Sequence, residues 1–502
     1  MTDTTMAPAE APRALHDEIS DRTRWLAFAA ILLAQFMNLI DVTIVNVAIP
    51  SLQRNLGASE SQIEWVVAGY ILVFALLLLP MGRLGDIIGR KQLFLVGVAA
   101  FTIVSAICGM AGSIEMLVIA RFLQGMAAAV MMPQVMAIAQ NLFAPRHRSG
   151  AFSMFGLVAG LASVAGPILG GTLINADLWG LGWRAIFLIN LPIGVIAFVA
   201  ASRLVPTVPG NPKLRNDWIG ILFMAAAMLA LIFPLVEGRT LGWPVWCFAL
   251  MCASPVFFAG FVMWEARQER LGNPQLMPIT LLKAWNFAIG STLALVYFSA
   301  LPALFLVIAL YLQSGYGFDP LHSGLTTVPF PVGILVASVI NSRLGPRWQK
   351  QRILFGLTLL WIGIFWLRSE ILATTDAVDH WRFLPALLMS GIGVSFSIAP
   401  MFQTILAGVP VKDAGAGSGA LQAVQQAGSA LGIAVVSQIF FSTLATAFAG
   451  GMAQHEAFRS AISTAMLYNL VAYVIVAACA LLLKKPQYTD DRAPRAPMPP
   501  MD

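Results

Sequence analysis

The residue of this chain best placed to do chemistry is an acid inside an apolar run. Asp41 lies in Gln35-Phe-Met-Asn-Leu-Ile-Asp-Val-Thr-Ile-Val-Asn-Val-Ala-Ile-Pro50. On a helix, the polar side chains of this run share one face, within an arc of roughly 140°: Gln35, Asn38, Asp41 and Asn46. A carboxyl shielded from water is costly to ionise, so Asp41 can load and release a proton in each cycle. The alternative is a carboxylate that is permanently paired and only holds its helix in place.

A basic residue lies in a second apolar run. Arg121 opens the sequence Arg121-Phe-Leu-Gln124-Gly125, and on a helix Arg121, Gln124 and Gly125 share a face. A guanidinium keeps its charge and can pair with an acid or an anionic ligand. The alternative is an arginine that extends to the lipid headgroups, because Arg121 lies near the end of its apolar run.

Glycines break two segments in a way that suggests movement. The segment 82–91 carries charges that can hold one conformation closed, with glycines that permit a tight turn: Gly82, Gly85, Asp86, Gly89 and Arg90. The segment 155–173 is uncharged and contains Gly166, Pro167, Gly170 and Gly171. Small residues at this spacing let membrane helices touch, and proline is tolerated there. The segment is therefore expected to be a close-packed, bending helix, or else a static packing groove.

A third polar stretch lies near the carboxyl end. In the run 415–432, uncharged donors and acceptors fall on an arc of about 100°: Ser418, Gln422, Gln425, Gln426 and Ser429. Such groups can line a cavity, with Gln35, Asn38 and Gln124 as further candidates to contact a substrate. They can equally bond one helix to another.

The composition places these residues in a membrane. Hydrophobic residues make up 58% of 502 positions and charged residues 11%, with a mean hydropathy of +0.79. A water-soluble core could not hide that much apolar surface. Membrane lipids are the expected surroundings, and the net charge of +6 belongs to particular loops rather than to a nucleic-acid site.

No pattern indicates an enzyme, a metal site or a cofactor. The four cysteines (Cys108, Cys247, Cys252 and Cys479) lie in apolar runs without Cys-x-x-Cys spacing, and the five histidines are widely separated. The sequence lacks Gly-x-Ser-x-Gly, His-Glu-x-x-His and Gly-Lys-Ser/Thr elements. A proton is the only chemical partner that these residues suggest besides a small molecule.

About 20 apolar residues cross a bilayer, which predicts an all-α membrane protein of fourteen helices. The expected spans are 25–49, 63–82, 92–112, 115–139, 150–174, 183–204, 217–236, 244–264, 285–312, 320–342, 353–369, 382–401, 416–446 and 462–483. Lys and Arg gather in the two tails and in every second loop between these spans. The positive-inside rule then puts both termini in the cytoplasm.

A weak repeat divides the chain. The segment 82–94, after the second span, aligns with 342–354, after the tenth, and both contain Arg-Leu-Gly. The second half then begins at the ninth span, so that two parallel six-helix bundles flank an inserted pair. The expected parts are a tail 1–24, a bundle 25–204, linkers with the inserted helices 205–284, a bundle 285–484 and a tail 485–502.

These motifs together resemble one transporter family. Asp41–Pro50, Gly82–Lys91, Arg121–Gly125, Gly166–Gly171 and Gly182–Gly194 are similar, in order, to signatures of the fourteen-span drug:proton antiporters of the major facilitator superfamily, the EmrB/QacA subfamily. The resemblance implies proton coupling at Asp41 and Arg121, gating by the 82–91 loop and a hinge at 166–171.

The function implied is export of lipophilic drugs or toxic compounds, driven by protons, across a bacterial cytoplasmic (inner) membrane. A secondary active transporter of this kind needs no cofactor. A dedicated exporter of one metabolite, antibiotic or siderophore is the alternative. The loop between the last two spans is short, unlike that of relatives that dock onto periplasmic adaptors, so we expect no obligate adaptor protein.

Overall fold

The computed structural model shows a chain built from long helices. It describes residues 20–143, 145–210, 216–238, 240–273, 275, 281, 283–344, 348–375, 377–406, 409 and 414–484. Within these ranges the regular structure is helical throughout. Thirteen described stretches are long and apolar enough to span a membrane, and a shorter apolar stretch, Gly160–Ala176, lies in a further helix. The predicted all-α membrane fold is confirmed.

The first part of the chain forms one group of helices. Its members are α2 (Asp21–Leu56), α3 (Glu60–Ile88), α4 (Arg90–Gly109), α5 (Ile114–Leu142), α6 (Pro145–Ala176), the short turns η1 (Leu178–Gly180) and η2 (Gly182–Arg184), α7 (Ala185–Leu188) and α8 (Asn190–Leu204). In this group α2 packs on α6 and α8, α5 packs on α3 and α4, and α4 also packs on α8.

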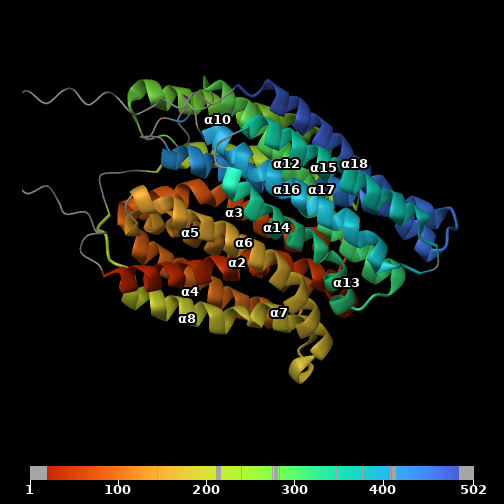
Figure 1. Ribbon diagram of the computed structural model, residues 1–502. Helices are drawn as coiled ribbons and strands as arrows, with labels where there is room; N and C mark the ends of the chain where they lie inside the picture. Colours follow the sequence, from red (N-terminus) through yellow and green to blue (C-terminus); the bar gives the residue numbers. More distant parts are fainter. Residues whose placement is uncertain are drawn as a thin grey trace, which may run out of the picture.

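The last part forms a second group. Its members are α12 (Trp285–Leu310), the π-helical η3 (Tyr311–Gly315), α13 (Pro320–Thr327), α14 (Pro329–Leu344), α15 (Gln349–Ala373), α16 (His380–Leu406), α17 (Ala414–Ala449) and α18 (Gln454–Leu482). Here α12 packs on α17 and α18, and α16 packs on α14 and α15. The two groups lie on opposite sides of the molecule in Figure 1.

Two helices, α9 (Trp218–Glu237) and α10 (Val245–Leu271), connect the groups and pack on each other. α9 also contacts α3 and α17. The Trp65 indole donates a 2.7 Å hydrogen bond to a carboxylate oxygen of Glu237, at the end of α9. The inserted pair is therefore attached to the side of the molecule where the two groups meet.

Short polar signals set the helix ends. α2 ends at Gly57, which adopts a left-handed conformation (φ 63°) that costs glycine little. Ser59 and Gln62 then form a capping box that starts α3, since each side chain bonds the other residue's backbone N–H. α3 and α4 meet at Gly89, whose φ of 110° is open to few residues other than glycine.

The two groups touch at the end of the molecule where α2 and α6 finish. The Gln313 side-chain amide, in η3, donates a 3.0 Å hydrogen bond to the Val47 carbonyl of α2. A Cβ atom on Gly171 of α6 would lie 2.5 Å from the Leu321 Cα of α13, so the two backbones are in direct contact there. Under the predicted orientation this is the outer end of the protein, and we call it the outer end below.

Candidate functional site

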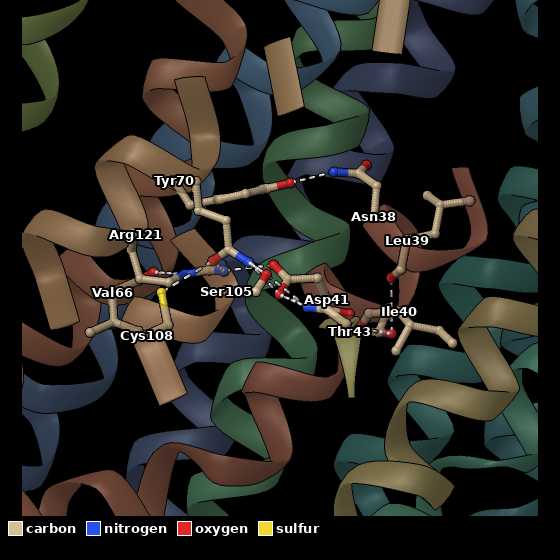
Figure 2. Close-up of polar contacts among 12 residues, drawn as sticks. Asn38, Leu39, Ile40, Asp41, Thr43, Val66, Tyr70, Ser105, Cys108 and Arg121 are labelled. Carbon is tan, nitrogen blue, oxygen red and sulfur yellow. Dashed lines mark hydrogen bonds and ion pairs between the residues drawn. The ribbon is translucent and has the colours of Figure 1, made fainter. Parts of the chain in front are cut away.

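Asp41 and Arg121 form a buried ion pair. Asp41 lies midway along α2 and is 0% exposed; Arg121, about two turns into α5, is 1% exposed. An Arg121 Nη1 lies 2.6 Å from Asp41 Oδ2. Figure 2 shows the two side chains meeting between their helices. An arginine reaching for lipid headgroups is therefore ruled out, because Arg121 points into the protein.

The second carboxylate oxygen has its own donors. Asp41 Oδ1 accepts hydrogen bonds from Gln124 Nε2 at 2.8 Å and from Asn190 Nδ2, at the start of α8, at 2.9 Å. Both amides also donate to Ser105 Oγ of α4, at 2.9 and 3.3 Å. Four helices, α2, α4, α5 and α8, thus converge on one carboxyl group.

Arg121 is held on every side. Its Nε donates to the Val66 carbonyl of α3 at 3.0 Å, and its Nη1 also donates to Gln124 Oε1 at 2.7 Å. The guanidinium lies over the Tyr70 ring, 4.2 Å from the centroid. Stacking and a fork of donors suit arginine, whereas a lysine could not satisfy all of these partners. The cation is therefore fixed in place opposite the Asp41 carboxyl group.

Close helix contacts make this geometry possible. A Cβ atom on Gly125 would lie 2.4 Å from the Tyr70 carbonyl oxygen. Only glycine lets α5 approach α3 this closely, and the approach brings Arg121 to Val66 and Tyr70. The Asn38 side chain, one turn before Asp41, donates a 2.5 Å hydrogen bond to the Tyr70 hydroxyl. α2, α3 and α5 are thereby locked together around the ion pair.

A buried ion pair is stable only while both partners are present. Separating charges from water costs several kcal/mol per ion, and removing one partner typically costs about 3–5 kcal/mol. The contact between α2 and α5 therefore depends on the charges of both side chains.

The 82–91 segment connects α3 and α4, but it is not the loop that its glycines suggested: α3 continues to Ile88, α4 begins at Arg90, and only Gly89 lies between the two helices. Asp86 and Arg90 form an ion pair at 2.9 Å, and Arg90 also donates to the Ala137 carbonyl of α5 at 3.2 Å. A Cβ on Gly85 would overlap the Gln134 side chain, which donates to the Met81 carbonyl at 2.9 Å. Gly82 lies beside α5 as well, with Pro133 3.5 Å from its Cβ position. This segment fastens α3 and α4 to α5 at the inner end.

The glycines of α6 contact both groups of helices. Positions 166 and 170 lie against Thr43 and Ile44 of α2, just beyond Asp41, while Gly171 meets α13. The Pro167 carbonyl lies 2.6 Å from the Cβ position of Gly324 in α13. This segment thus connects the neighbourhood of Asp41 to the outer contact between the groups.

The predicted substrate-contacting residues separate into two sets. Asn38 and Gln124 are buried and hydrogen-bonded to Tyr70 and to the ion pair, and Gln35 is half-buried nearby on α2. On α17, Gln422 is exposed and Gln425 and Gln426 are half-buried. Among the described residues, no hydrogen bond joins this second set to Asp41. The Ser418 side chain lies outside the described residues.

Sequence reasoning missed three members of the site. Asn190 lies inside the quoted 182–194 motif but was assigned no role, and neither Ser105 nor Tyr70 was singled out. Each is a polar group within an apolar run, and Asn190 and Ser105 are both 0% exposed. That isolation was the available signal, since an amide in a membrane helix needs a partner.

Comparisons with known proteins agree with this architecture. Residues 31–433 match the family model described as Major Facilitator Superfamily. The chain belongs to the major facilitator superfamily. It is therefore a membrane transporter rather than an enzyme, and the drug:proton antiporter resemblance is supported by its relatives.

The curated relatives carry names of exporters and resistance proteins. The "Probable actinorhodin transporter" of Streptomyces coelicolor is 41% identical over 84% of this chain and 73% of its own length. The "Tetracenomycin C resistance and export protein" of Streptomyces glaucescens is 31% identical, over 84% and 77%. The "Multidrug resistance protein Stp" of Mycobacterium tuberculosis has the same identity and coverage.

Solved structures share the fold at low identity. A peptide transporter of the POT family, PepTSo, gives a TM-score of 0.67 at 15% identity, over 92% of this chain and 98% of that one. A bacterial homologue of the lysosomal transporter Spinster gives 0.63 at 16% identity, over 94% and 100%. These likenesses show the arrangement of helices.

Proposed function

We propose that this transporter exports lipophilic drugs or antibiotics in exchange for protons across the bacterial cytoplasmic membrane. The observation that carries the proposal is the Asp41–Arg121 pair, 2.6 Å apart and closed off from water. A carboxyl opposite a permanent cation has two states of different charge. Each state favours a different packing of the helices around it.

The cycle follows from these two states. A proton from the outer water binds Asp41 and converts its carboxylate to a neutral acid, which releases Arg121 from the ion pair. The site then opens to the cytoplasm, where Asp41 gives up the proton to water and the pair re-forms. Substrate binding in the inward-open state favours that release. One proton enters for each substrate molecule that leaves through this site.

The substrate class rests on the relatives and on the chemistry of the chain. Three relatives bear the words actinorhodin, tetracenomycin C and multidrug in their names. The uncharged amides of Gln422, Gln425 and Gln426 supply donors and acceptors on a helix that carries no charged residue. Amide groups among apolar surfaces suit lipophilic molecules that carry a few polar atoms.

A dedicated antibiotic exporter is the second candidate. The observation that favours it is the 41% identity to a relative named for a single compound, against 31% to the relative named for many drugs. The mechanism is the same in both cases. Efflux of ethidium and puromycin by this protein would favour the multidrug function, and indifference to both would favour the dedicated one.

The loop between α17 and α18 is short. It runs only from the end of α17 at Ala449 to the start of α18 at Gln454. So short a connection leaves little surface for a periplasmic adaptor. We propose that the protein works without one, and that both of its termini are cytoplasmic.

Replacement of Asp41 by asparagine tests the coupling. Asn has the shape of a protonated Asp but cannot exchange a proton, and its NH2 group is a donor where the carboxylate accepts from Arg121 or the amides. Asp41→Asn should reduce proton-driven efflux of ethidium from everted vesicles by at least tenfold, while the purified protein still shows a cooperative thermal transition, at a lower temperature than the wild type because the ion pair is lost. Glu115→Gln, which neutralises an exposed carboxyl on α5, is the matched control and should transport like the wild type. Wild-type efflux by Asp41→Asn would refute the proposal.

A further inference from the structure

A second carboxyl is buried in the molecule, outside the Asp41 site. Glu64 lies one turn into α3 and is 2% exposed. Its Oε2 atom is closed off from water and has no hydrogen-bond partner. Among the described residues no donor or cation is bonded to the Glu64 side chain. An ionised carboxylate is rarely left in such a position.

Helix geometry places Glu64 on the side of α3 that faces the second group. Gln62 and Val66 contact α5, through a 2.8 Å bond to Glu115 and through the Arg121 bond. At 100° per residue, Glu64 is on roughly the opposite side of α3. Leu79, within about 60° of Glu64 on the same wheel, contacts Gly419 of α17. Glu64 therefore points toward the interface between the two groups, at its outer end.

Another carboxylate lies beside this part of α3. Glu237, at the end of α9, accepts hydrogen bonds from the indole of Trp65, the residue next to Glu64, and from Thr240. The titratable groups that the helices packed on α3 bring to this half of the molecule are Glu237 of α9, Glu115 and Arg121 of α5, Asp41 and Arg54 of α2, and Cys108 of α4. α17 contributes none between Ala414 and Ala449. Arg121 is already engaged with Asp41.

A negative charge on Glu64 would thus be unpaired, dry and next to a like charge. Each of these conditions disfavours the ionised form. The outer end is closed in this structure, as the Gln313–Val47 bond and the Gly171–Leu321 contact show. The closed arrangement therefore favours the neutral form of the Glu64 side chain over its ionised form.

We propose that Glu64 is a second proton-binding site, whose protonation is required before the outer end can close. The inference rests on the proposed proton antiport. It adds to that cycle a gate at the outer end, controlled by Glu64. When the outer end is open, Glu64 is hydrated, and its carboxylate takes a proton from the outer water to become a neutral acid. The proton stays on Glu64 while the end is closed and returns to the outer water on reopening. No net proton crosses the membrane through Glu64.

α3 links this gate to the coupling site. Val66 is two residues beyond Glu64, about 3 Å along the helix axis, and its carbonyl holds Arg121. Tyr70, one turn further, carries the guanidinium on its ring. A movement of α3 that exposes Glu64 therefore also moves two partners of Arg121.

A distance measurement across the outer end tests the gate. Spin labels on Asn55→Cys and Met452→Cys, both exposed positions at the outer ends of the two groups, report its opening. Cys252 and Cys479 are replaced by serine, since Cys108 and Cys247 are buried. A closed outer end brings the two labels close together. In the wild type, the fraction of molecules with this short distance should rise as pH falls from 9 to 5. In Glu64→Gln, whose side chain at position 64 is neutral at every pH, the short distance should dominate throughout.

Matched variants distinguish the effect of Glu64 from the effects of the other acidic residues in this part of the molecule. Glu115→Gln, an exposed carboxyl at the same end, should follow the wild-type curve. Glu237→Gln removes the like charge, so an ionised Glu64 is tolerated better and the curve should move to lower pH. Asp41→Asn should keep the pH response, whatever its effect on transport. The proposal is overturned if Glu64→Gln follows the wild-type curve, if the wild type stays closed at every pH, or if Asp41→Asn alone removes the response.

Discussion

At the scale of single residues, the site is an ion pair whose carboxylate also accepts hydrogen bonds from two side-chain amides. Asp41 accepts from Arg121, Gln124 and Asn190, and the two amides share Ser105 behind it. Each donor stabilises the carboxylate relative to the neutral acid. The donors therefore hold the carboxyl group in place, and Asn190 is the donor that contributes least to other contacts.

Asn190→Ala should weaken the coupling site. Loss of one hydrogen bond to a charged group costs about 1.5–3 kcal/mol. Asp41 Oδ1 then keeps only Gln124 as a donor, so the carboxyl is held less firmly opposite Arg121. Proton-driven efflux of ethidium from everted vesicles should therefore fall by roughly tenfold or more, about 1.4 kcal/mol for each factor of ten.

Ser105→Ala provides the comparison for that prediction. Ser105 contacts both amides but not the carboxylate, so its removal should lower efflux by less than Asn190→Ala does. Equal losses in the two variants would show that Asn190 has a packing role alone.

The sequence predicted part of this site. An acid and a basic residue inside apolar runs were visible because charges in lipid are costly. The pairing of Asp41 with Arg121 was not predictable, because 80 residues separate them and helix periodicity does not show which helix faces meet. Asn190 and Ser105 escaped notice because single amides and hydroxyls are common in membrane helices and show their importance only through a partner.

At the scale of elements, α6 is the helix that connects the site to the outer contact. Its small residues predicted close packing, and the structure supplies the partners: α2 on one side and α13 and α14 on the other. The partner helices could not be read from the glycine spacing, because that pattern describes only one of the two surfaces. Whether α6 bends during transport stays a prediction.

Two glycines of α6 differ in what an added methyl group would meet. At Gly171 it would lie 2.5 Å from the Leu321 Cα and 2.8 Å from the Pro320 carbonyl, both backbone atoms. At Gly160 it would meet the end of the flexible Leu335 side chain. Gly171→Ala should therefore prevent full closure of the outer end and lower ethidium efflux by roughly tenfold, about 1.4 kcal/mol in the barrier.

Gly160→Ala is the matched control within the same helix. Leu335 can change rotamer, so transport should stay within about twofold of wild type. Efflux assays in everted vesicles compare the two variants at equal expression. Equal losses in both would mean that α6 tolerates no added bulk anywhere, and would remove the special place given to the α6–α13 contact.

At the scale of the whole molecule, helix number and order were predictable and the assembly was not. All fourteen expected spans coincide with described helices, because bilayer thickness dictates the length of an apolar run. The position of α9 against α3 and α17 depended on contacts such as Trp65 with Glu237, which no periodicity reveals. The boundaries expected for the two six-helix bundles and for the inserted pair stay predictions.

Orientation in the membrane is the property on which the outer end and the proton pathway both depend. The alternation of Lys and Arg between loops predicts that Asn55 and Met452 face outward and that Lys283, before α12, faces the cytoplasm. All three positions are exposed. With Cys252 and Cys479 replaced by serine, a cysteine at position 55 or 452 should react with a membrane-impermeant maleimide on intact cells. A cysteine at position 283 should react only after the cells are lysed. The reverse pattern would place Glu64 at the cytoplasmic end, where a proton gate for the outer side has no function.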